Sequence, residues 1–161
     1  MPVEPRYRDR AVALAITDGH VLVIRRVHPT WGEYYVFPGG GVEDGEAPTD
    51  AVQRELREET GLHVIAGRKV MTGSTPEGFM HHYFLVTTPM VPVALPQDAE
   101  ESAPERTKRR GTYEPMWIPV KRIPELNLKP EVVTKKLLEC INNGFPDVPV
   151  DLGPLYADIR K

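Results

Sequence analysis

The sequence predicts a single α/β or α+β domain, and three observations support this class. The chain has 161 residues, a length that suits one domain with one core. Short apolar segments typical of strands recur along it, and two helical patterns are set apart by such strands. Neither an internal repeat nor a domain boundary is visible, so residues 1–161 are expected to form one domain with a proline-spaced C-terminal tail at 145–161.

The first elements are expected to form a β-hairpin. Residues 11–17 are typical of a strand, Asp18-Gly19 of a tight turn, and 21–25 of the returning strand. Residues 28–33 are then expected to form a loop. A short strand at 34–37 should follow, ended by a proline and three glycines.

Two amphipathic helices are expected. The first covers 48–60, where Pro48 suits the first helical turn and Gly61 the C-terminal stop. The second covers 130–143 and ends at Gly144. One stripe of this second helix is apolar and is expected to face the core: Val133, Leu137, Cys140 and Ile141.

The remaining chain is expected to contain three strands and one long loop. The strand patterns lie at 63–73, 80–88 and 116–119. Residues 96–111 contain almost no apolar side chains, which indicates a mobile loop. The apolar tail residues are expected to pack on the domain or on a second copy, which predicts a homodimer: Leu152, Leu155, Tyr156 and Ile159.

Composition excludes several classes of protein. The net charge of −3 provides no basic field for nucleic acid, so no nucleic-acid partner is expected. Cys140 is alone, which excludes an intramolecular disulfide and fits a reducing compartment. The N-terminus has no signal-peptide core, and the apolar runs are too short to cross a bilayer. We therefore expect a soluble cytoplasmic protein with no membrane partner.

Three glutamates share one narrow arc of the first helix. With Glu55 at 0°, Glu59 lies near about 40° and Glu58 near about −60°, since each residue turns about 100°. Like charges at these spacings repel, so they need a counter-charge. Three consecutive glycines just before the helix let the backbone approach a ligand closely and offer a carbonyl to the same ion.

The glutamate arc overlaps the apolar side of the helix, where Val52 and Leu56 lie. The opposite half, expected to face water, is polar: Asp50, Gln53, Arg54 and Arg57. Glutamates placed only for solubility would lie on that half. Partial burial makes an unpaired carboxylate costly, and a bound hard cation removes this cost. Such an acidic, oxygen-rich cluster suits Mg²⁺ or Mn²⁺.

The segment from Gly40 to Leu62 resembles the Nudix box, Gly-x5-Glu-x7-Arg-Glu-apolar-x-Glu-Glu-x-Gly-apolar, at every fixed position. The resemblance implies an α/β/α sandwich around a mixed β-sheet. It also implies a hydrolase that uses Mg²⁺, or Mn²⁺, to cut a pyrophosphate bond by attack of water. The implied substrate is a small nucleotide: a nucleoside triphosphate, a nucleotide sugar or a compound of the ADP-ribose type.

The resemblance also implies roles for individual residues. Glu55, Glu58 and Glu59 would hold the metal, and Glu58 and Glu59 would be catalytic. The carbonyl of Gly39 would reach the same ion. Arg54, four residues before Glu58, would orient that carboxylate. The remaining implied role is structural, since Glu46 would stabilise the junction of loop and helix.

The general base and the substrate contacts are expected outside the box. Glu114 is the candidate base, with Glu105 as the alternative. Arg26 is expected to contact a phosphate, and Tyr35 to stack on a base. Alternation along the strand lets only one member of the pair His81 and His82 face the site.

Three other functions compete with hydrolysis of a small nucleotide. A catalytically silent Nudix domain that senses a nucleotide usually lacks box glutamates, and all are present here. An isomerase on the same scaffold needs a cysteine near the metal site, whereas Cys140 lies in the second helix. An enzyme acting on RNA ends is disfavoured by the net negative charge.

Overall fold

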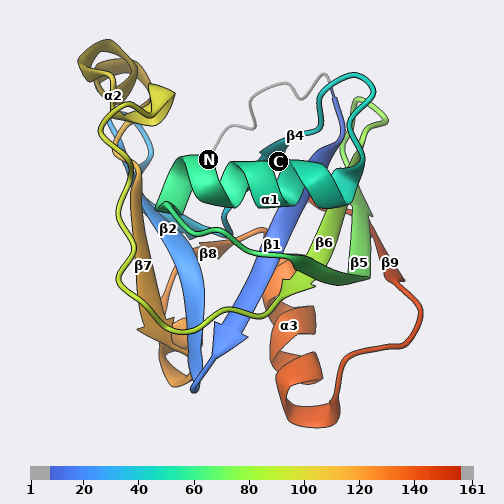
Figure 1. The fold of residues 1–161 in the computed structure, drawn as a ribbon. Coiled ribbons are helices and arrows are strands. Elements are labelled where there is room, and N and C mark those ends of the chain that lie inside the picture. Colours follow the sequence, from blue (N-terminus) through green and yellow to red (C-terminus); the bar gives the residue numbers. More distant parts are fainter. Residues whose placement is uncertain (1–7, 157–161) are drawn as a thin grey trace.

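The computed structural model describes residues 8–156, which form a mixed β-sheet with helices on both faces (Figure 1). The main strand order is β8-β3-β2-β1-β6-β5-β9, while β4 pairs with β1 and β7 with β2. The strands are β1 Arg10–Thr17, β2 His20–His28, β3 Gly32–Val36, β4 Gly39–Gly41, β5 Ala66–Ser74, β6 Met80–Val86, β7 Glu114–Pro119, β8 Leu128–Lys129 and β9 Val150–Pro154. The helices are α1 Pro48–Thr60, α2 Pro104–Arg110 and α3 Glu131–Asn143, with short 3₁₀ turns at Glu100–Ser102 and Val120–Glu125.

The predicted α/β/α architecture is confirmed, with α1 on one face of the sheet and α3 on the other (Figure 1). One buried cluster joins α1 to the alanines of β1, through Ala51, Val52 and Leu56. The other cluster lies under α3 and includes Cys140. Residues alternate across a strand, so β1 contributes to both clusters. The predicted core position of Cys140 is therefore confirmed, on the face opposite α1.

The predicted hairpin is confirmed, and its turn has the expected backbone. Asp18 and Gly19 have φ values of 48° and 71°, and Thr17 pairs with His20. Positive φ at both central positions matches the twist of the flanking strands, which explains the Asp-Gly pair. The predicted loop at 28–33 is wrong in extent, because β2 continues to His28 and pairs there with Gly32. Pairing with β3 and β7 extends this strand beyond its apolar run.

The three glycines, expected only to end the preceding strand, form a short strand of their own, β4, against β1. Ala11 pairs with Gly40, and Val12 with Gly39. A Cβ atom on Gly39 would lie 2.4 Å from the carbonyl oxygen of Ala11, so only glycine permits this close approach. Helix α1 matches its predicted bounds, and Gly61 ends it with a φ of 79° and an N–H bonded to Arg57.

The segment 96–111 is more ordered than predicted, since it contains a 3₁₀ turn and α2. Local charges account for this order: Arg106 on α2 pairs with Glu100 at 2.9 Å and Glu101 at 3.9 Å. Pro104 also suits the first turn of α2. A scan for apolar periodicity detects neither effect.

The C-terminal tail packs on its own domain. Strand β9 pairs parallel to β5, and the next two side chains, Leu155 and Tyr156, are buried. Ile159 lies outside the described residues. The apolar residues that suggested a dimer contact are thus largely used within one chain, and a homodimer stays a prediction. No helix within residues 8–156 is long and apolar enough to cross a membrane.

Candidate functional site

Arg54 neutralises several acids at the junction of loop and helix. Its guanidinium donates to Glu46 at 2.9 Å, Glu55 at 3.0 Å, Glu58 at 3.2 Å and the carbonyl of Gly41 at 2.9 Å. The planar, five-donor guanidinium suits such a fork of acceptors. The angular positions along the helix predicted that Arg54 faces water. Its side chain is only 18% exposed, however, because these acceptors hold it against the loop.

Glu46 fixes the loop before the helix, in the place expected for it. Its carboxylate also accepts the backbone N–H of Glu43 at 3.0 Å. The hydrogen bond from Arg54 lowers the pKa of Glu46, so this acid stays ionised. Gln53 is also less exposed than expected, since its side-chain oxygen accepts the N–H of Ala66 at 2.9 Å. Arg57, in contrast, is exposed as predicted.

Glu59 is the most buried acid of α1, with a residue exposure of 2%. Its two oxygens accept one hydrogen bond each, from the N–H of Gly39 at 3.2 Å and from the Tyr113 hydroxyl at 3.1 Å. Burial raises the pKa of Glu59 well above its usual range, and the charge of Glu55 raises it further. Both donors are neutral groups, so the carboxylate is oriented by them without a hydrogen-bonded cation.

Glu55 is half-buried, so its exposure to solvent is intermediate between those of the buried Glu59 and the exposed Glu58. Burial raises the pKa of Glu55, and Arg54 partly offsets that rise. A Cβ atom on Gly40 would lie 2.2 Å from the Glu55 carboxyl carbon, so the glycine loop makes room for this acid. Glu58 is 45% exposed in its side chain. The three glutamates of one helical arc thus experience three different environments.

Within residues 8–156, no three His, Cys, Asp or Glu side chains are placed so that they could together hold a metal ion. The cluster of three carboxylates expected from the helical spacing is therefore absent from that range. Arg54 donates hydrogen bonds to Glu55 and Glu58, whereas Tyr113 and Gly39 donate to Glu59. The donors still fit a hard divalent cation. They are oxygens, and the repulsion between the buried Glu59 and the half-buried Glu55 would be relieved by one. The Gly39 carbonyl at present accepts from Arg10 at 3.2 Å.

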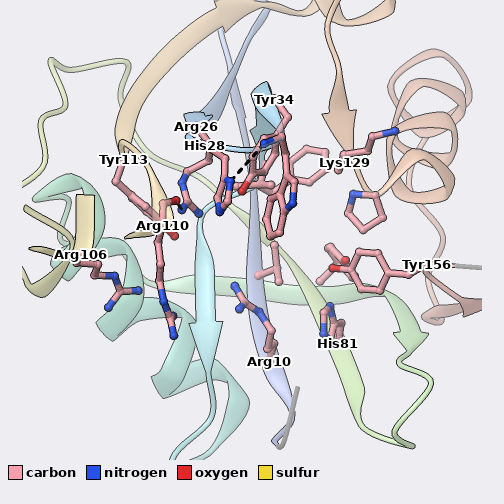
Figure 2. Close-up of a pocket in the computed structure, with 16 residues that line it drawn as sticks. Arg10, Arg26, His28, Tyr34, His81, Arg106, Arg110, Tyr113, Lys129 and Tyr156 are labelled. Atoms are coloured by element: carbon pink, nitrogen blue, oxygen red, sulfur yellow. Dashed lines mark hydrogen bonds between the residues drawn. The ribbon is translucent and has the colours of Figure 1, made fainter. Parts of the chain in front are cut away.

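A cavity lies beside Glu59 and is lined by two kinds of side chain (Figure 2). The wall nearest Glu59 includes Tyr113, which donates to that carboxylate. Arginines come from β1, β2 and α2: Arg10, Arg26, Arg106 and Arg110. Rings come from β2, the turn after it, β3, β6 and the segment after β9: His28, Trp31, Tyr34, His81 and Tyr156. The cavity can therefore accept a ligand that is anionic at one end and flat at the other.

The two predicted substrate contacts have different positions. Arg26 lines the cavity, but its Nε and Nη2 donate to the carbonyls of Thr112 at 2.7 Å and Arg110 at 2.6 Å. Its guanidinium also lies over the Tyr113 ring, 4.5 Å from the centroid. Arg26 thus holds the cavity wall together. Tyr35 points to the opposite face of β3, because strand residues alternate and Tyr34 occupies the cavity side.

The acids proposed as general base lie away from the cavity lining. Glu114 pairs with Arg25 at 3.3 Å, and Arg25 also pairs with Glu33 at 2.7 Å. Glu105 is exposed on α2. Neither side chain lines the cavity.

Glu101 is a residue that sequence reasoning missed. Its side chain is only 13% exposed, and its charge contributes to raising the pKa values of Glu59 and Tyr113. It lies in the 3₁₀ turn before α2, in a segment whose polar composition predicted only a loop. Nothing in the local sequence distinguishes Glu101 from Glu100, and only folding of the turn buries one of them rather than the other.

The two histidines of β6 divide as alternation predicts. His81 is buried and lines the cavity, with its ring edge-on to Tyr156 at a centroid distance of 6.0 Å. His82 points the other way, within 3.4 Å of Asp9 and 3.2 Å of Lys69. Trp31 stacks on His28 at 3.7 Å, which builds a flat aromatic wall beside Tyr34.

Comparison with known proteins gives one family model, described as NUDIX domain, which matches residues 7–137. A protein named RNA pyrophosphohydrolase from Psychrobacter sp. (strain PRwf-1) is 49% identical over 53 residues. That match covers 32% of this chain and 28% of the relative. The chain therefore aligns with less than a third of the length of this curated relative.

Solved structures share the fold at low sequence identity. A NUDIX hydrolase from Nitrosomonas europaea has a TM-score of 0.67 at 11% identity, covering 94% of this chain and 81% of the other. The E. coli ORF135 protein has a TM-score of 0.61 at 19% identity, covering 87% of this chain and 94% of the other. These likenesses establish the fold.

Proposed function

Because this chain belongs to the Nudix family, we propose that it is a metal-dependent hydrolase that cleaves a pyrophosphate bond in a nucleoside diphosphate derivative. The observation that carries the proposal is the position of Glu59. This buried carboxylate accepts a hydrogen bond from Tyr113, and Tyr113 also lines a cavity that contains four arginines. An acid suited to a cation therefore lies beside groups suited to phosphate.

The residues divide between holding the metal and holding the substrate. Glu55, Glu58 and Glu59 would hold Mg²⁺ or Mn²⁺, with the Gly39 carbonyl as a further donor. When bound, such an ion supplies charge neutralisation at phosphate oxygens and a more acidic water. Arg54 keeps Glu55 and Glu58 oriented from one side. Arg10, Arg106 and Arg110 would bind the phosphates, which keeps the scissile bond at the Glu59 end.

The test is a substrate panel of nucleoside triphosphates, nucleotide sugars and ADP-ribose with Mg²⁺, with released phosphate, pyrophosphate and nucleotide measured. We expect turnover of at least one compound, its loss in excess chelator, and its return with Mg²⁺ or Mn²⁺. Undiminished turnover in chelator would overturn the metal-dependent mechanism. Binding without turnover of any compound would instead favour the alternative, a catalytically silent domain that senses a nucleotide.

A second candidate substrate is the 5′ end of an RNA. It is favoured by the name of the Psychrobacter relative and by exposed cations on α2, Lys108 and Arg109, next to the cavity residue Arg110. These cations could bind phosphates of a longer chain despite the negative net charge. The two candidate substrates are distinguished by the rate at which pyrophosphate or phosphate is released. This rate is compared for a 5′-triphosphorylated oligonucleotide and for a free nucleoside triphosphate. Lys108→Gln with Arg109→Gln should slow only the RNA reaction.

A further inference from the structure

The cavity beside Glu59 has chemically different ends (Figure 2). Arg106, Arg110 and Tyr113 lie together at one end of the view, and Tyr156 and His81 lie at the other. Arg10 extends between them from β1. Since Tyr113 donates to Glu59, the end with the arginines is also the end near the box carboxylates.

The Tyr156 end has little free positive charge. Lys129 lines it, but its ammonium points away from the cavity and pairs with Glu131 at 2.6 Å (Figure 2). The other labelled side chains there are the phenol of Tyr156 and the imidazole of His81, and Pro130, next to Lys129 in the chain, also lines the cavity (Figure 2). Flat, largely apolar walls of this kind bind aromatic bases by stacking, whereas phosphates would lack cationic partners.

The C-terminal strand brings Tyr156 to this end. Pairing of β9 with β5 places Leu155 against Gly73, where a Cβ atom would lie 2.2 Å from the leucine, and Tyr156 follows next to His81 on β6. Tyr156 is buried in the described structure, where it belongs to the core cluster under α3 and its ring packs against that of His81. It lies beyond residues 7–137, the range that the family model matches.

We propose that Tyr156 is a specificity-determining residue, and that the cavity binds a 5′-phosphorylated nucleoside with its phosphates at the arginine end and its base at the Tyr156 end. The assignment of this orientation rests on the proposed function, which requires the phosphates to lie near Glu59. A ligand with phosphates on every side, or with no ring, would leave the aromatic walls without a partner. The base is therefore the part of the ligand that Tyr156, two residues beyond β9, selects.

Binding is tested by calorimetry in chelator, so that no hydrolysis is needed. Adenosine, guanosine and uridine 5′-diphosphates are compared with inorganic pyrophosphate, which carries the same phosphates without a base. We expect at least one nucleotide to bind about tenfold or more tightly than pyrophosphate. Tyr156→Leu should remove most of this advantage and leave the Kd of pyrophosphate unchanged. The matched control is Phe145→Leu, an aromatic residue of the C-terminal segment outside the cavity, which should keep the advantage.

A second measurement does not depend on how well the Tyr156 variant folds. Trp31 and Trp117 are the two tryptophans of the chain, so Trp117→Phe leaves Trp31 as the reporter in the cavity. Its fluorescence should change more on adding the favoured nucleotide than on adding pyrophosphate, because a base can stack on the aromatic wall that Trp31 forms with His28, whereas a phosphate cannot. Equal affinities for nucleotide and pyrophosphate, or a Trp31 signal that pyrophosphate reproduces, would overturn the proposal. A nucleotide that binds in this way but is not hydrolysed with Mg²⁺ would leave the pocket assignment standing and refute only the proposed hydrolysis.

Discussion

Among single residues, the glutamates of α1 differ in the groups that compensate their charge. Glu55 and Glu58 accept hydrogen bonds from a guanidinium, whereas Glu59 accepts from a neutral amide and a neutral hydroxyl. A buried carboxylate with only neutral donors retains more of its desolvation cost. Glu59 is thus the member of the set from which a bound cation would gain most.

The first residue-level prediction concerns these acids. Glu58→Gln and Glu59→Gln should each lower kcat by about 100-fold or more, since glutamine keeps the shape but not the charge. The melting temperature in chelator should hold or rise, because each change removes a charge that repels Glu55. Arg57→Gln, on the exposed side, should change neither quantity. Full activity in both glutamine variants would place the active site elsewhere.

The second residue-level prediction concerns Tyr113. Tyr113→Phe removes the hydroxyl that orients Glu59, so we expect kcat to fall about tenfold and the Kd for Mn²⁺ to rise, while KM changes little. The check is a double-mutant cycle. In the Glu59→Gln background, Tyr113→Phe should have almost no further effect on kcat, because the carboxylate that the Tyr113 hydroxyl orients is already absent. An undiminished effect in that background would show that Tyr113 acts independently of Glu59.

At the scale of elements, the segments outside the box complete the site. The turn Glu100–Ser102 and α2 bring Glu101 and two arginines toward α1, and β9 brings Tyr156 to the other end of the cavity. Both segments are polar or proline-spaced in sequence. Their order comes from ion pairs and from strand pairing with the rest of the fold.

The turn before α2 leads to a test of the general base. Glu101→Gln should lower kcat by about 100-fold if Glu101 moves the proton, a typical size for general base catalysis. Glu114→Gln should keep kcat within about twofold, because Glu114 pairs with Arg25 outside the cavity lining. The reverse pattern would favour Glu114, the base expected from the sequence.

Strand β9 leads to a stability prediction. Leu155 is 5% exposed and fills the space above Gly73, so Leu155→Ala should lower the free energy of unfolding by about 2–4 kcal/mol. For a domain of this size that lowers the melting temperature by about 5–15 °C, measurable by calorimetry. Val148→Ala, at a residue 74% exposed, is the matched control and should be neutral. No change in the Leu155 variant would mean that β9 does not pack as described.

At the scale of the whole molecule, α1 and α3 lie on opposite faces of the sheet, and α1 carries the box glutamates. The cluster under α3 contains Cys140, far from the box helix on the other face. A cysteine there is unsuited to the isomerase alternative. The site itself lies where α1, β4 and the cavity meet, so binding of a metal there should stabilise the entire fold by linkage.

The whole-molecule prediction is therefore thermal. Mn²⁺ at about 100 times its Kd should add about 2.7 kcal/mol, or about 5–10 °C in melting temperature, to the wild-type protein. The Glu59→Gln protein should show a much smaller shift, because its carboxylate charge is lost. Differential scanning calorimetry with and without Mn²⁺ measures both. Equal shifts in the two proteins would mean that the cation binds away from the box.

The sequence by itself determined the elements whose signals are local. The Asp18-Gly19 turn, both long helices and the complete box depend on short-range backbone and spacing rules, and the structure agrees with each. The α/β/α fold followed from the resemblance that the box carries. Local patterns suffice wherever the residues that interact are close in the chain.

Only the tertiary structure decided which side chains of these elements meet. The angular positions along the helix predicted that Arg54 faces water and that the three glutamates lie together. Packing against the glycines instead shields most of the Arg54 side chain, and it buries Glu59 while Glu58 stays exposed. Tyr113 and Tyr156 reach the cavity through pairing of β7 with β2 and of β9 with β5. Strand pairing depends on partners distant in the chain, so periodicity within one segment separates the two faces of a strand, as for His81 and His82, but does not tell which face borders the site.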